Sequence, residues 1–288
     1  MSSVDLQQWV NKTQHETDVV TLAPAQAMAA TLDLDQSFDT GSVIPPLWHW
    51  LYFLPKAQRS AIGPDGHPKR GGFLPPITLP RRMWAGSRLQ WHGDLRVGDH
   101  IERTSTIESV ESKSGRSGEL IFVKLRHAVG VIGGATALVE WQDLVYRDAP
   151  PPSSAGSSAP APAGAPAPQQ AQWLQRWEPD PVLLFRFSAL TFNGHRIHYD
   201  RPYAMNEEGY TGLVVHGPLL AVLMIELARK SAPTKKVQDF SFRGLAPVID
   251  TAAFEVCGNP DPSGQNASLF VRGPGGVLNT QASIAFAD

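Results

Sequence analysis

A tract rich in proline, alanine and serine near the middle of the chain limits what the rest can fold into. It covers residues 148–168 and reads DAPPPSSAGSSAPAPAGAPAP. Such a segment buries too little apolar surface to offset the entropy of ordering it, and its prolines keep it extended. We therefore expect a linker over residues 148–169 that joins an N-terminal half, residues 1–147, to a C-terminal half, residues 170–288.

The two halves share a pattern that is typical of a diverged repeat. An apolar segment opened by proline lies at residues 46–54 in the first half and at residues 218–227 in the second. Proline suits the first turn of a helix because its missing N–H would have no partner there. Each half is therefore expected to contain one buried helix. Further along, the shift that places Leu89 on Phe240 also aligns Trp91 with Phe242, Gly93 with Gly244, Val97 with Val248 and Asp99 with Asp250.

Strand candidates follow each predicted helix. In the last of them, alternation puts Leu278, Ile284 and Phe286 on one face, as in a half-buried strand. Glycine-rich breaks separate the candidates. A buried helix followed by antiparallel strands, found twice, predicts an α+β fold. The candidates are residues 101–111, 119–132 and 135–146 in the first half, and residues 251–258, 267–272 and 277–286 in the second.

Charge and cysteine content exclude several classes of protein. The formal net charge is −2, so no basic surface is expected and nucleic-acid binding is disfavoured. The single cysteine, Cys257, rules out a disulfide within the chain and fits a reducing compartment. The polar N-terminal residues do not resemble a signal peptide, and the apolar run at 218–227 is too short to span a bilayer. We expect a cytoplasmic protein that does not insert into a membrane.

An insertion separates the predicted helix of the first half from the strand that aligns with the second. It covers residues 58–82 and contains Lys69, Arg70, Arg81 and Arg82. The insertion is either a solvated surface loop, or a lid or a phosphate contact for coenzyme A. The sequence has neither a GxxxxGK[ST] motif nor a GxGxxG fingerprint, so nucleotide hydrolysis and NAD-dependent chemistry have no support.

Polar side chains are concentrated directly before the apolar segment at residues 218–227. Asn193, His195, His198, Asp200 and His216 all lie within this stretch. A buried polar group without a partner costs roughly 1–3 kcal/mol. Functional sites are where such costs are commonly tolerated, so this cluster is the first candidate for a site.

These residues resemble the hydratase motif of the MaoC-like (R)-hydratases, roughly YSxxSGDxNPLHxD followed by HGML or HGPL. The opening FSALT, the ending IHYD and the second block HGPL match at residues 187–191, 197–200 and 216–219. The string FNGHRIHYD is similar to a subgroup that contains the mesaconyl-C4-CoA (3-methylfumaryl-CoA) hydratases and the mitochondrial hydroxyacyl-thioester dehydratases. The chain departs from the motif at two positions: Asn193 replaces the family's catalytic aspartate, and His195 replaces its asparagine.

The resemblance implies a tandem, or double, hot-dog fold, in which each half is an antiparallel sheet wrapped around a buried helix. It also implies a hydro-lyase that adds water reversibly to an enoyl-CoA, most directly to mesaconyl-C4-CoA to give citramalyl-CoA. The C-terminal half would be catalytic, and the degenerate N-terminal half would supply part of the acyl pocket. No redox cofactor and no metal is implied. A homodimer of such pseudo-dimeric chains stays open.

Hydration of an enoyl thioester needs a base for water, a proton for the α-carbon and stabilisation of the thioester oxygen. The resemblance gives the base role to His198. Because an amide cannot act as a base, Asn193 is expected to position water or thioester. Gly217 would let the thioester approach the N–H groups at a helix N-terminus. The remaining motif residues are expected to bind substrate or to stabilise the loop: His195, Arg196, Asp200 and His216.

A second carboxylate on the acyl group would need a cation, and arginine binds carboxylates through two parallel hydrogen bonds. Arg88, Arg186, Arg196 and Arg243 are the candidates, and Arg196 is favoured because it lies inside the motif. Three other activities stay open. They are a 3-hydroxyacyl-thioester dehydratase of fatty acid metabolism, a hot-dog thioesterase, and a non-catalytic protein that binds acyl thioesters.

Overall fold

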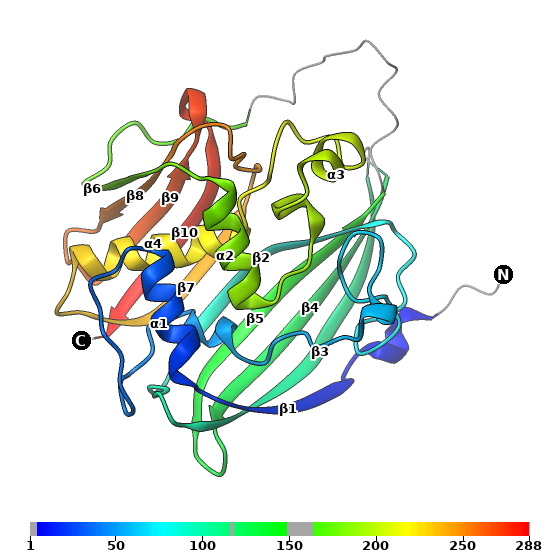
Figure 1. Cartoon of the computed structure of the whole chain (residues 1–288), viewed down its shortest axis with the longest axis horizontal. Coiled ribbons are helices and arrows are strands. Elements are labelled where there is room, and N and C mark those ends of the chain that lie inside the picture. The colour runs from blue at the N-terminus through cyan, green and yellow to red at the C-terminus, as the bar shows by residue number, and fades with distance from the viewer. Residues whose placement is uncertain (1–4, 116–117, 149–163, 288) are drawn as a thin grey trace.

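The computed structural model describes residues 5–115, 118–148 and 164–287 (Figure 1). Most of the predicted linker lies outside the described residues. The ordered strands of the N-terminal half all precede it, and those of the C-terminal half all follow it. Within the described residues, no helix is long and apolar enough to cross a membrane.

The strands form one antiparallel sheet in the order β1-β3-β4-β5-β2-β7-β10-β9-β8-β6 (Figure 1). The first five positions in this order belong to the N-terminal half and the last five to the C-terminal half. The strands are β1 (Thr13–Val19), β2 (Arg81–Trp91), β3 (His100–Gly115), β4 (Gly118–Val131), β5 (Thr136–Arg147), β6 (Trp173–Trp177), β7 (Lys236–Gly244), β8 (Phe254–Pro260), β9 (Asn266–Arg272) and β10 (Leu278–Ala287). The six strand candidates of the sequence correspond to β3, β4, β5, β8, β9 and β10.

The halves meet where β2 pairs with β7. In that antiparallel register Leu89 lies directly opposite Phe240, the same two residues that the repeat alignment matches. Both side chains are buried. A twofold relation between antiparallel strands passes through the pair of equivalent residues, so the seam has the register of a pseudo-dimer. The chain therefore has the tandem hot-dog architecture expected from the sequence.

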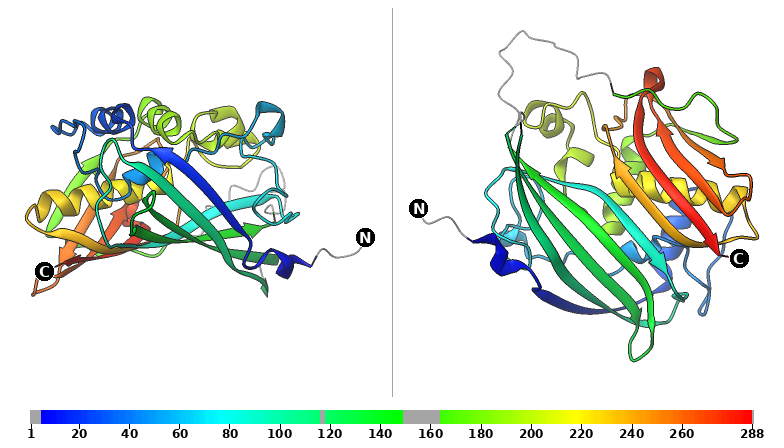
Figure 2. Two further views of the ribbon diagram at one scale, coloured as in Figure 1. Left: turned by 90° about the horizontal axis from the view of Figure 1, so that it is seen from below. Right: turned by 180° about the vertical axis from the view of Figure 1, so that it is seen from behind.

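The helices gather on one side of the sheet (Figure 2, left). The predicted buried helix of the C-terminal half is confirmed as α4 (Gly217–Ser231), which packs mainly against β8 and has nine buried residues. The other helices lie outside it or beside it: α1 (Leu22–Thr31), α2 (Pro181–Thr191) and α3 (Arg201–Asn206), with the short 3-10 helices η1 (Leu6–Trp9), η2 (Trp48–Leu51), η3 (Arg59–Ala61), η4 (Arg196–His198) and η5 (Pro274–Gly276).

The helix predicted at residues 46–54 is wrong in its length. Only the single 3-10 turn η2 forms, because Leu47 before it and Phe53 after it have left-handed backbone conformations, with φ of 71° and 54°. The N–H of Phe53 donates to the Asp18 carboxylate at 2.7 Å instead of continuing a helix. The turn is nevertheless the core of its half, since Trp48 is completely buried.

The end of the predicted linker is also different from the expectation. Residues 164–168 pack on the C-terminal half, although their composition predicted a free tether. Ala167 N–H donates to the Gly276 carbonyl, and Leu278 N–H donates to the Ala165 carbonyl, each at 2.8 Å. Backbone hydrogen bonds to the turn before β10 therefore fix this short stretch without help from its side chains.

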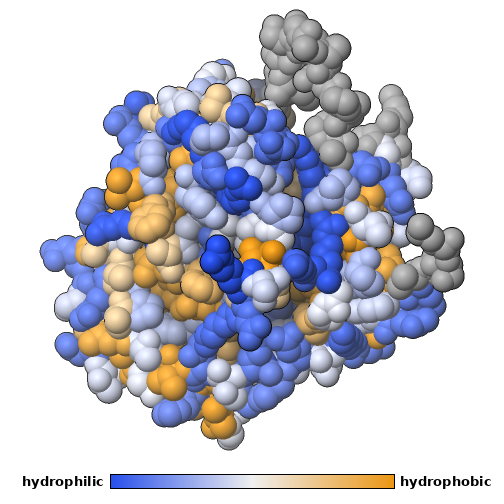
Figure 3. All heavy atoms as spheres, turned by 45° about the vertical axis from the view of Figure 1, so that its right-hand side comes forward, coloured by the Kyte–Doolittle hydropathy of each residue, from blue (hydrophilic) through white to orange (hydrophobic). Residues whose placement is uncertain are grey.

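Hydrophobic side chains remain exposed beside the outer helices. Val182 and Phe185 on α2, and Phe192 just after it, are each more than half exposed. Figure 3 shows hydrophobic residues gathered on the left-hand part of the face it presents, next to hydrophilic ones. Nothing among the described residues covers these side chains.

Candidate active site

His198 is held in one tautomer by the backbone of the segment that precedes α4. Its Nδ1 lies 2.6 Å from the Val214 carbonyl oxygen, which can only accept, so Nδ1 carries the proton. Val214 N–H in turn donates to the Ile197 carbonyl at 3.0 Å. The ring is nearly buried, and burial lowers the pKa of His198 to about 4 although the bond to Val214 opposes that shift. His198 is therefore neutral at pH 7, with the lone pair of Nε2 available as a base.

His216 supports His198 from behind. The two rings stack with centroids 3.7 Å apart and an interplanar angle of 19°. His216 is completely buried, and its Nε2 lies 2.8 Å from the Ser188 hydroxyl of α2. Burial, together with the neighbouring His198 and His195, holds the pKa of His216 well below its usual range. His216 is therefore packed inside the protein, and its role in stabilising the loop stays a prediction.

Asn193 and His195 belong to a tight turn that follows α2. Phe192 ends the helix in a left-handed conformation, and Asn193 N–H donates to the Ser188 carbonyl at 2.8 Å. The Asn193 side-chain oxygen accepts the His195 N–H at 3.0 Å. The ring of His195 meets that of His198 edge-on, 5.5 Å between centroids. Burial and the charges of His67 and His198 lower the pKa of His195 to about 2.

Asp200 and Arg196 form a structural pair. The Asp200 carboxylate caps α3 by accepting the Tyr203 N–H at 3.1 Å. It also accepts two hydrogen bonds from Arg196, at 2.8 and 2.9 Å. Arg196 donates further to the Pro64 carbonyl and lies over the Tyr203 ring. Its guanidinium is thus largely engaged within the protein.

Gly217 is the first residue of α4, directly after the cap residue His216. Its N–H has no partner inside the helix, and the helix dipole favours negative charge at this end. A Cβ at Gly217 would meet nothing within 4 Å. Open space therefore lies next to an unpaired N–H, one residue from the His216 ring that stacks on His198. An oxyanion site needs an available N–H donor of this kind, so the oxyanion role of Gly217 stays a prediction.

The insertion of the N-terminal half reaches this site. Asp65 and His67 lie at its tip, and the His67 ring packs on the His195 ring with 4.2 Å between centroids. Arg196 N–H donates to the Asp65 carbonyl at 2.9 Å. These contacts favour the interpretation of the insertion as a lid over the site, and the sequence did not predict them. Three of the four basic residues of the insertion have partners within the protein: Lys69 donates to the Ser60 carbonyl, Arg70 to the carbonyls of Ile77 and Pro80, and Arg81 pairs with Glu208.

The other arginine candidates lie elsewhere. Arg88 on β2 is paired with Asp239 and stacks over Trp141, Arg186 on α2 is exposed and donates to the Ala30 carbonyl, and Arg243 on β7 is exposed. Arg82 of β2 instead acts on the site through its charge, which lowers the pKa values of both His67 and His195.

One trio of side chains offers donor atoms close enough for a cation. Atoms of Asp65, His67 and His195 lie within 4.8 Å of one another. The Asp65 carboxylate, however, already accepts a hydrogen bond from His67 Nδ1 at 3.0 Å, and this bond accounts for the arrangement without an ion.

Two other features stand apart from the site. Glu140, buried in the N-terminal half, accepts hydrogen bonds from His49, Trp50 and Ser87, and these and the neighbouring histidines keep its pKa at about 2 against the effect of burial.

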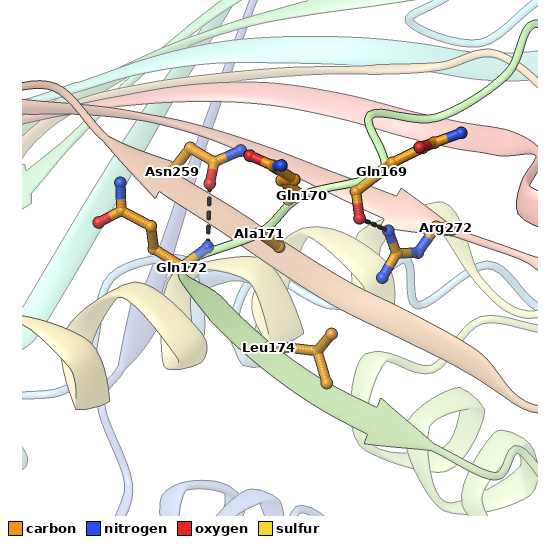
Figure 4. Close-up of a pocket in the computed structure, with 7 residues that line it drawn as sticks. All are labelled: Gln169, Gln170, Ala171, Gln172, Leu174, Asn259 and Arg272. Atoms are coloured by element: carbon orange, nitrogen blue, oxygen red, sulfur yellow. Dashed lines mark hydrogen bonds between the residues drawn. The ribbon is translucent and has the colours of Figure 1, made fainter.

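A hollow of about 670 Å³ lies at the start of β6 (Figure 4). Its polar groups bond to one another: Gln172 N–H donates to Asn259, and Arg272 to the Gln169 carbonyl.

Comparison with known proteins identifies relatives over nearly the whole chain. Residues 47–250 match the family model of hydroxyacyl-thioester dehydratase type 2. The chain is 46% identical to the mesaconyl-C(4)-CoA hydratase of Chloroflexus aurantiacus over 99% of both chains. It is 27% identical to the mitochondrial hydroxyacyl-thioester dehydratase type 2 of Schizosaccharomyces pombe, over 83% of this chain and 88% of that protein.

Solved structures with the same fold are more distant in sequence. A MaoC-like dehydratase from Phytophthora capsici superposes with a TM-score of 0.69 at 14% identity, covering 99% of each chain. A conserved protein of Mycobacterium tuberculosis, described as having a double hot-dog fold, gives 0.57 at 15% identity over 96% of each chain. At these identities the likeness establishes the fold alone.

Proposed function

Because this chain belongs to the hydroxyacyl-thioester dehydratase type 2 family, we propose that it is a hydro-lyase that hydrates an enoyl-CoA reversibly, converting mesaconyl-C4-CoA to citramalyl-CoA. The whole-length identity to a mesaconyl-C(4)-CoA hydratase supports this substrate. The observation that carries the chemistry is the neutral His198, whose Nδ1 is fixed by Val214 so that Nε2 is left as a base.

The proposed reaction uses two groups, Nε2 of His198 and the N–H of Gly217. Nε2 of His198 takes a proton from water while the water oxygen bonds to the β-carbon, and the imidazolium so formed delivers that proton to the α-carbon. Negative charge that develops on the thioester oxygen is stabilised by the N–H of Gly217 and by the dipole of α4. In the reverse direction the same ring removes the α-proton and returns it to the leaving hydroxyl.

Asn193 takes the position of the family's aspartate but cannot share the base role. Its oxygen is occupied by the His195 N–H, so its NH₂ group is the part that can orient water or the thioester carbonyl. One histidine then carries the proton transfers, and the amide supplies geometry.

The structure favours a different arginine from the one that the sequence favoured as the partner of a distal carboxylate. Arg196 is engaged by Asp200 and Pro64, so Arg196→Ala is expected to disturb the loop and to affect all substrates. Arg82, which interacts with the Tyr146 hydroxyl, is the next candidate, since its charge adds to the effect of burial on the pKa values of His67 and His195. Arg82→Gln should therefore lower kcat/KM for mesaconyl-C4-CoA more than for crotonyl-CoA.

The proposal is tested with purified protein and three thioesters: mesaconyl-C4-CoA, crotonyl-CoA and a long-chain trans-2-enoyl-CoA. Loss of the conjugated thioester absorbance gives kcat/KM for each, and His198→Ala is the inactive control. General-base catalysis contributes about 10²–10⁴-fold, so the variant should lose that factor in kcat. Equal or better use of crotonyl-CoA would refute the preference for a distal carboxylate. Full activity of His198→Ala would remove the base assignment.

A 3-hydroxyacyl-thioester dehydratase is the second candidate, and the Schizosaccharomyces pombe relative supports it. It predicts the highest kcat/KM with the long-chain thioester. Binding of all three thioesters without turnover would instead indicate a non-catalytic acyl-thioester binding protein. A cytoplasmic location, a homodimer of pseudo-dimeric chains and the absence of nucleic-acid partners stay predictions.

A further inference from the structure

The tip of the insertion is docked on the catalytic loop with unusual closeness. Gly66 has φ of 92°, and a Cβ built on it would lie 1.7 Å from the carbonyl oxygen of Gly194. A Cβ on Gly194 would lie 2.7 Å from the Gly66 carbonyl oxygen. Only glycine fits at such an approach of two backbones. Segments more than a hundred residues apart in the sequence are therefore fitted to each other at the site.

Hydrogen bonds hold the two segments in this position. The N–H of Arg196 donates to the Asp65 carbonyl at 2.9 Å, and its guanidinium donates to the Pro64 carbonyl at 3.0 Å. Asp65 also bonds twice to His67, accepting the backbone N–H on one oxygen and Nδ1–H on the other, each at 3.0 Å. The carboxylate thus fixes both the rotation and the tautomer of the His67 ring.

The oriented His67 ring then touches the catalytic loop through His195. The centroids of His67 and His195 are 4.2 Å apart, and those of His195 and His198 are 5.5 Å apart. The order of contacts is a carboxylate, an oriented imidazole, the His195 ring and the base. The motif lacks a carboxylate at Asn193, and Asp65 of the N-terminal half places a carboxylate in the same row of contacts.

We propose that Asp65 and His67 are positioning residues of the hydratase site: Asp65 orients His67, and His67 fixes His195 and the loop that carries Asn193 and His198. This rests on the proposed function for its catalytic meaning. The site is then composite, because the catalytic half depends on a clamp from the N-terminal half.

The test compares Asp65→Ala and His67→Ala with the control Lys69→Ala, which alters an exposed residue of the same insertion. Each clamp variant should lower kcat for the best thioester by roughly 10- to 100-fold, as for groups that orient a catalytic residue. KM should change by less than about threefold, and the melting temperature should stay near that of Lys69→Ala. Asp65→Asn keeps an acceptor for one of the two His67 bonds and should recover part of the loss.

If His67 had only a structural role, its removal would not change the pKa values of His195 and His198. Removing His67 admits water to His195 and His198 and removes a neighbour whose charge lowers the pKa of His198, so that pKa should rise. Asp65 and Arg82 act on His195 in opposite directions and remain in this variant. The acid limb of kcat in His67→Ala should therefore move to higher pH, and nuclear magnetic resonance of labelled imidazoles should show His195 titrating at higher pH.

The outcomes separate this inference from the proposed function. If the wild-type protein hydrates no thioester, the proposed function fails, while the imidazole titrations still decide the clamp. Clamp variants that match Lys69→Ala in kcat, acid limb and titration would overturn the inference. So would one equivalent of tightly bound metal in the purified protein that is lost in Asp65→Ala, because the trio would then be a metal centre.

Discussion

Four imidazole rings lie in contact through the site, and burial lowers the pKa of each. They run from His67 through His195 and His198 to His216, with centroids 4.2, 5.5 and 3.7 Å apart. Charging any one of them would place a cation against its neighbours in a poorly solvated region. The row is therefore neutral at pH 7, so His198 is unprotonated at Nε2 although it lacks the carboxylate partner of the family motif.

The first prediction concerns pH. Because the pKa of His198 is lowered to about 4, kcat should be independent of pH from 8 down to about 5 and fall only nearer 4. The stability of the fold should change over a different pH range from kcat. In the unfolded chain these histidines bind protons below about pH 6.5, whereas the folded chain binds them only at lower pH, so the free energy of unfolding should decrease from pH 6.5 downward. A pH–rate profile and urea unfolding at pH 7 and 5 measure both. An acid limb near 6.5 would show that His198 is solvated.

The second prediction concerns Asn193→Asp. Aspartate keeps the acceptor for the His195 N–H but loses the NH₂ donor and adds a negative charge beside neutral imidazoles. We expect kcat to fall by roughly 10- to 100-fold, with an acid limb moved to higher pH because the carboxylate raises the histidine pKa values. Activity equal to the wild type with an unchanged pH profile would mean that the site has merely lost an ancestral acid.

Sequence reasoning found the residues of the motif but not those that complete it. The two motif blocks meet in the fold because the His198 ring stacks on the His216 ring, and Gly217 follows His216 directly. Asp65 and His67 carry no signal of their own, since an aspartate near a histidine in a glycine- and proline-rich loop is ordinary. Only tertiary docking brings them to His195. Arg196 was favoured for its place in the motif, and the structure instead pairs it with Asp200.

At the scale of elements, the two apolar segments opened by proline have different fates. Residues 218–227 carry apolar side chains all round and form the buried α4. Residues 46–54 are rich in aromatic side chains, which fill the same volume with a single turn. His49 and Trp50 of that turn bond to the buried Glu140, so polar contacts replace helical ones. Proline and apolarity predicted the place of this element, but the left-handed residues Leu47 and Phe53 at its ends limit it to one turn.

Edge elements were missed for a physical reason. β1 and β6 lie at the two ends of the sheet and have no buried residue, so their sequences lack the alternation of a half-buried strand. The six strands with a predicted range, β3, β4, β5, β8, β9 and β10, agree with that range within a few residues. The repeat alignment also agrees with the seam at one pair, because Leu89 lies opposite Phe240 in the register of β2 and β7.

The third prediction belongs to the insertion as an element. Gly66→Ala cannot keep its present contact with Gly194, whereas Gly71→Ala has nearly the same φ, 95°, and meets nothing closer than 3.8 Å. The two changes carry similar backbone strain and differ in space. Gly66→Ala should lower kcat at least tenfold, about the lower range for loss of a positioning contact, and Gly71→Ala should not. Limited proteolysis of the insertion would check the undocking, and equal activity of the two variants would show that the dock is unimportant.

At the scale of the whole molecule, a single sheet unites two halves whose connection lies outside the described residues. The fourth prediction is that residues 149–163 act only as a tether. A Gly/Ser segment of equal length should leave kcat and the melting temperature nearly unchanged. Residues 164–168 must be retained, because Ala165 and Ala167 bond to the turn before β10. A large loss of either property would show that residues 149–163 pack.

The seam between β2 and β7 also decides how the protein responds to dilution. Two separate hot-dog subunits joined by this ladder would dissociate as their concentration fell, and a site built from both would be lost. Here the partner is attached to the same chain, so its effective concentration is set by the tether and not by the amount of protein present. The composite site should therefore assemble by a first-order process and persist at nanomolar concentration.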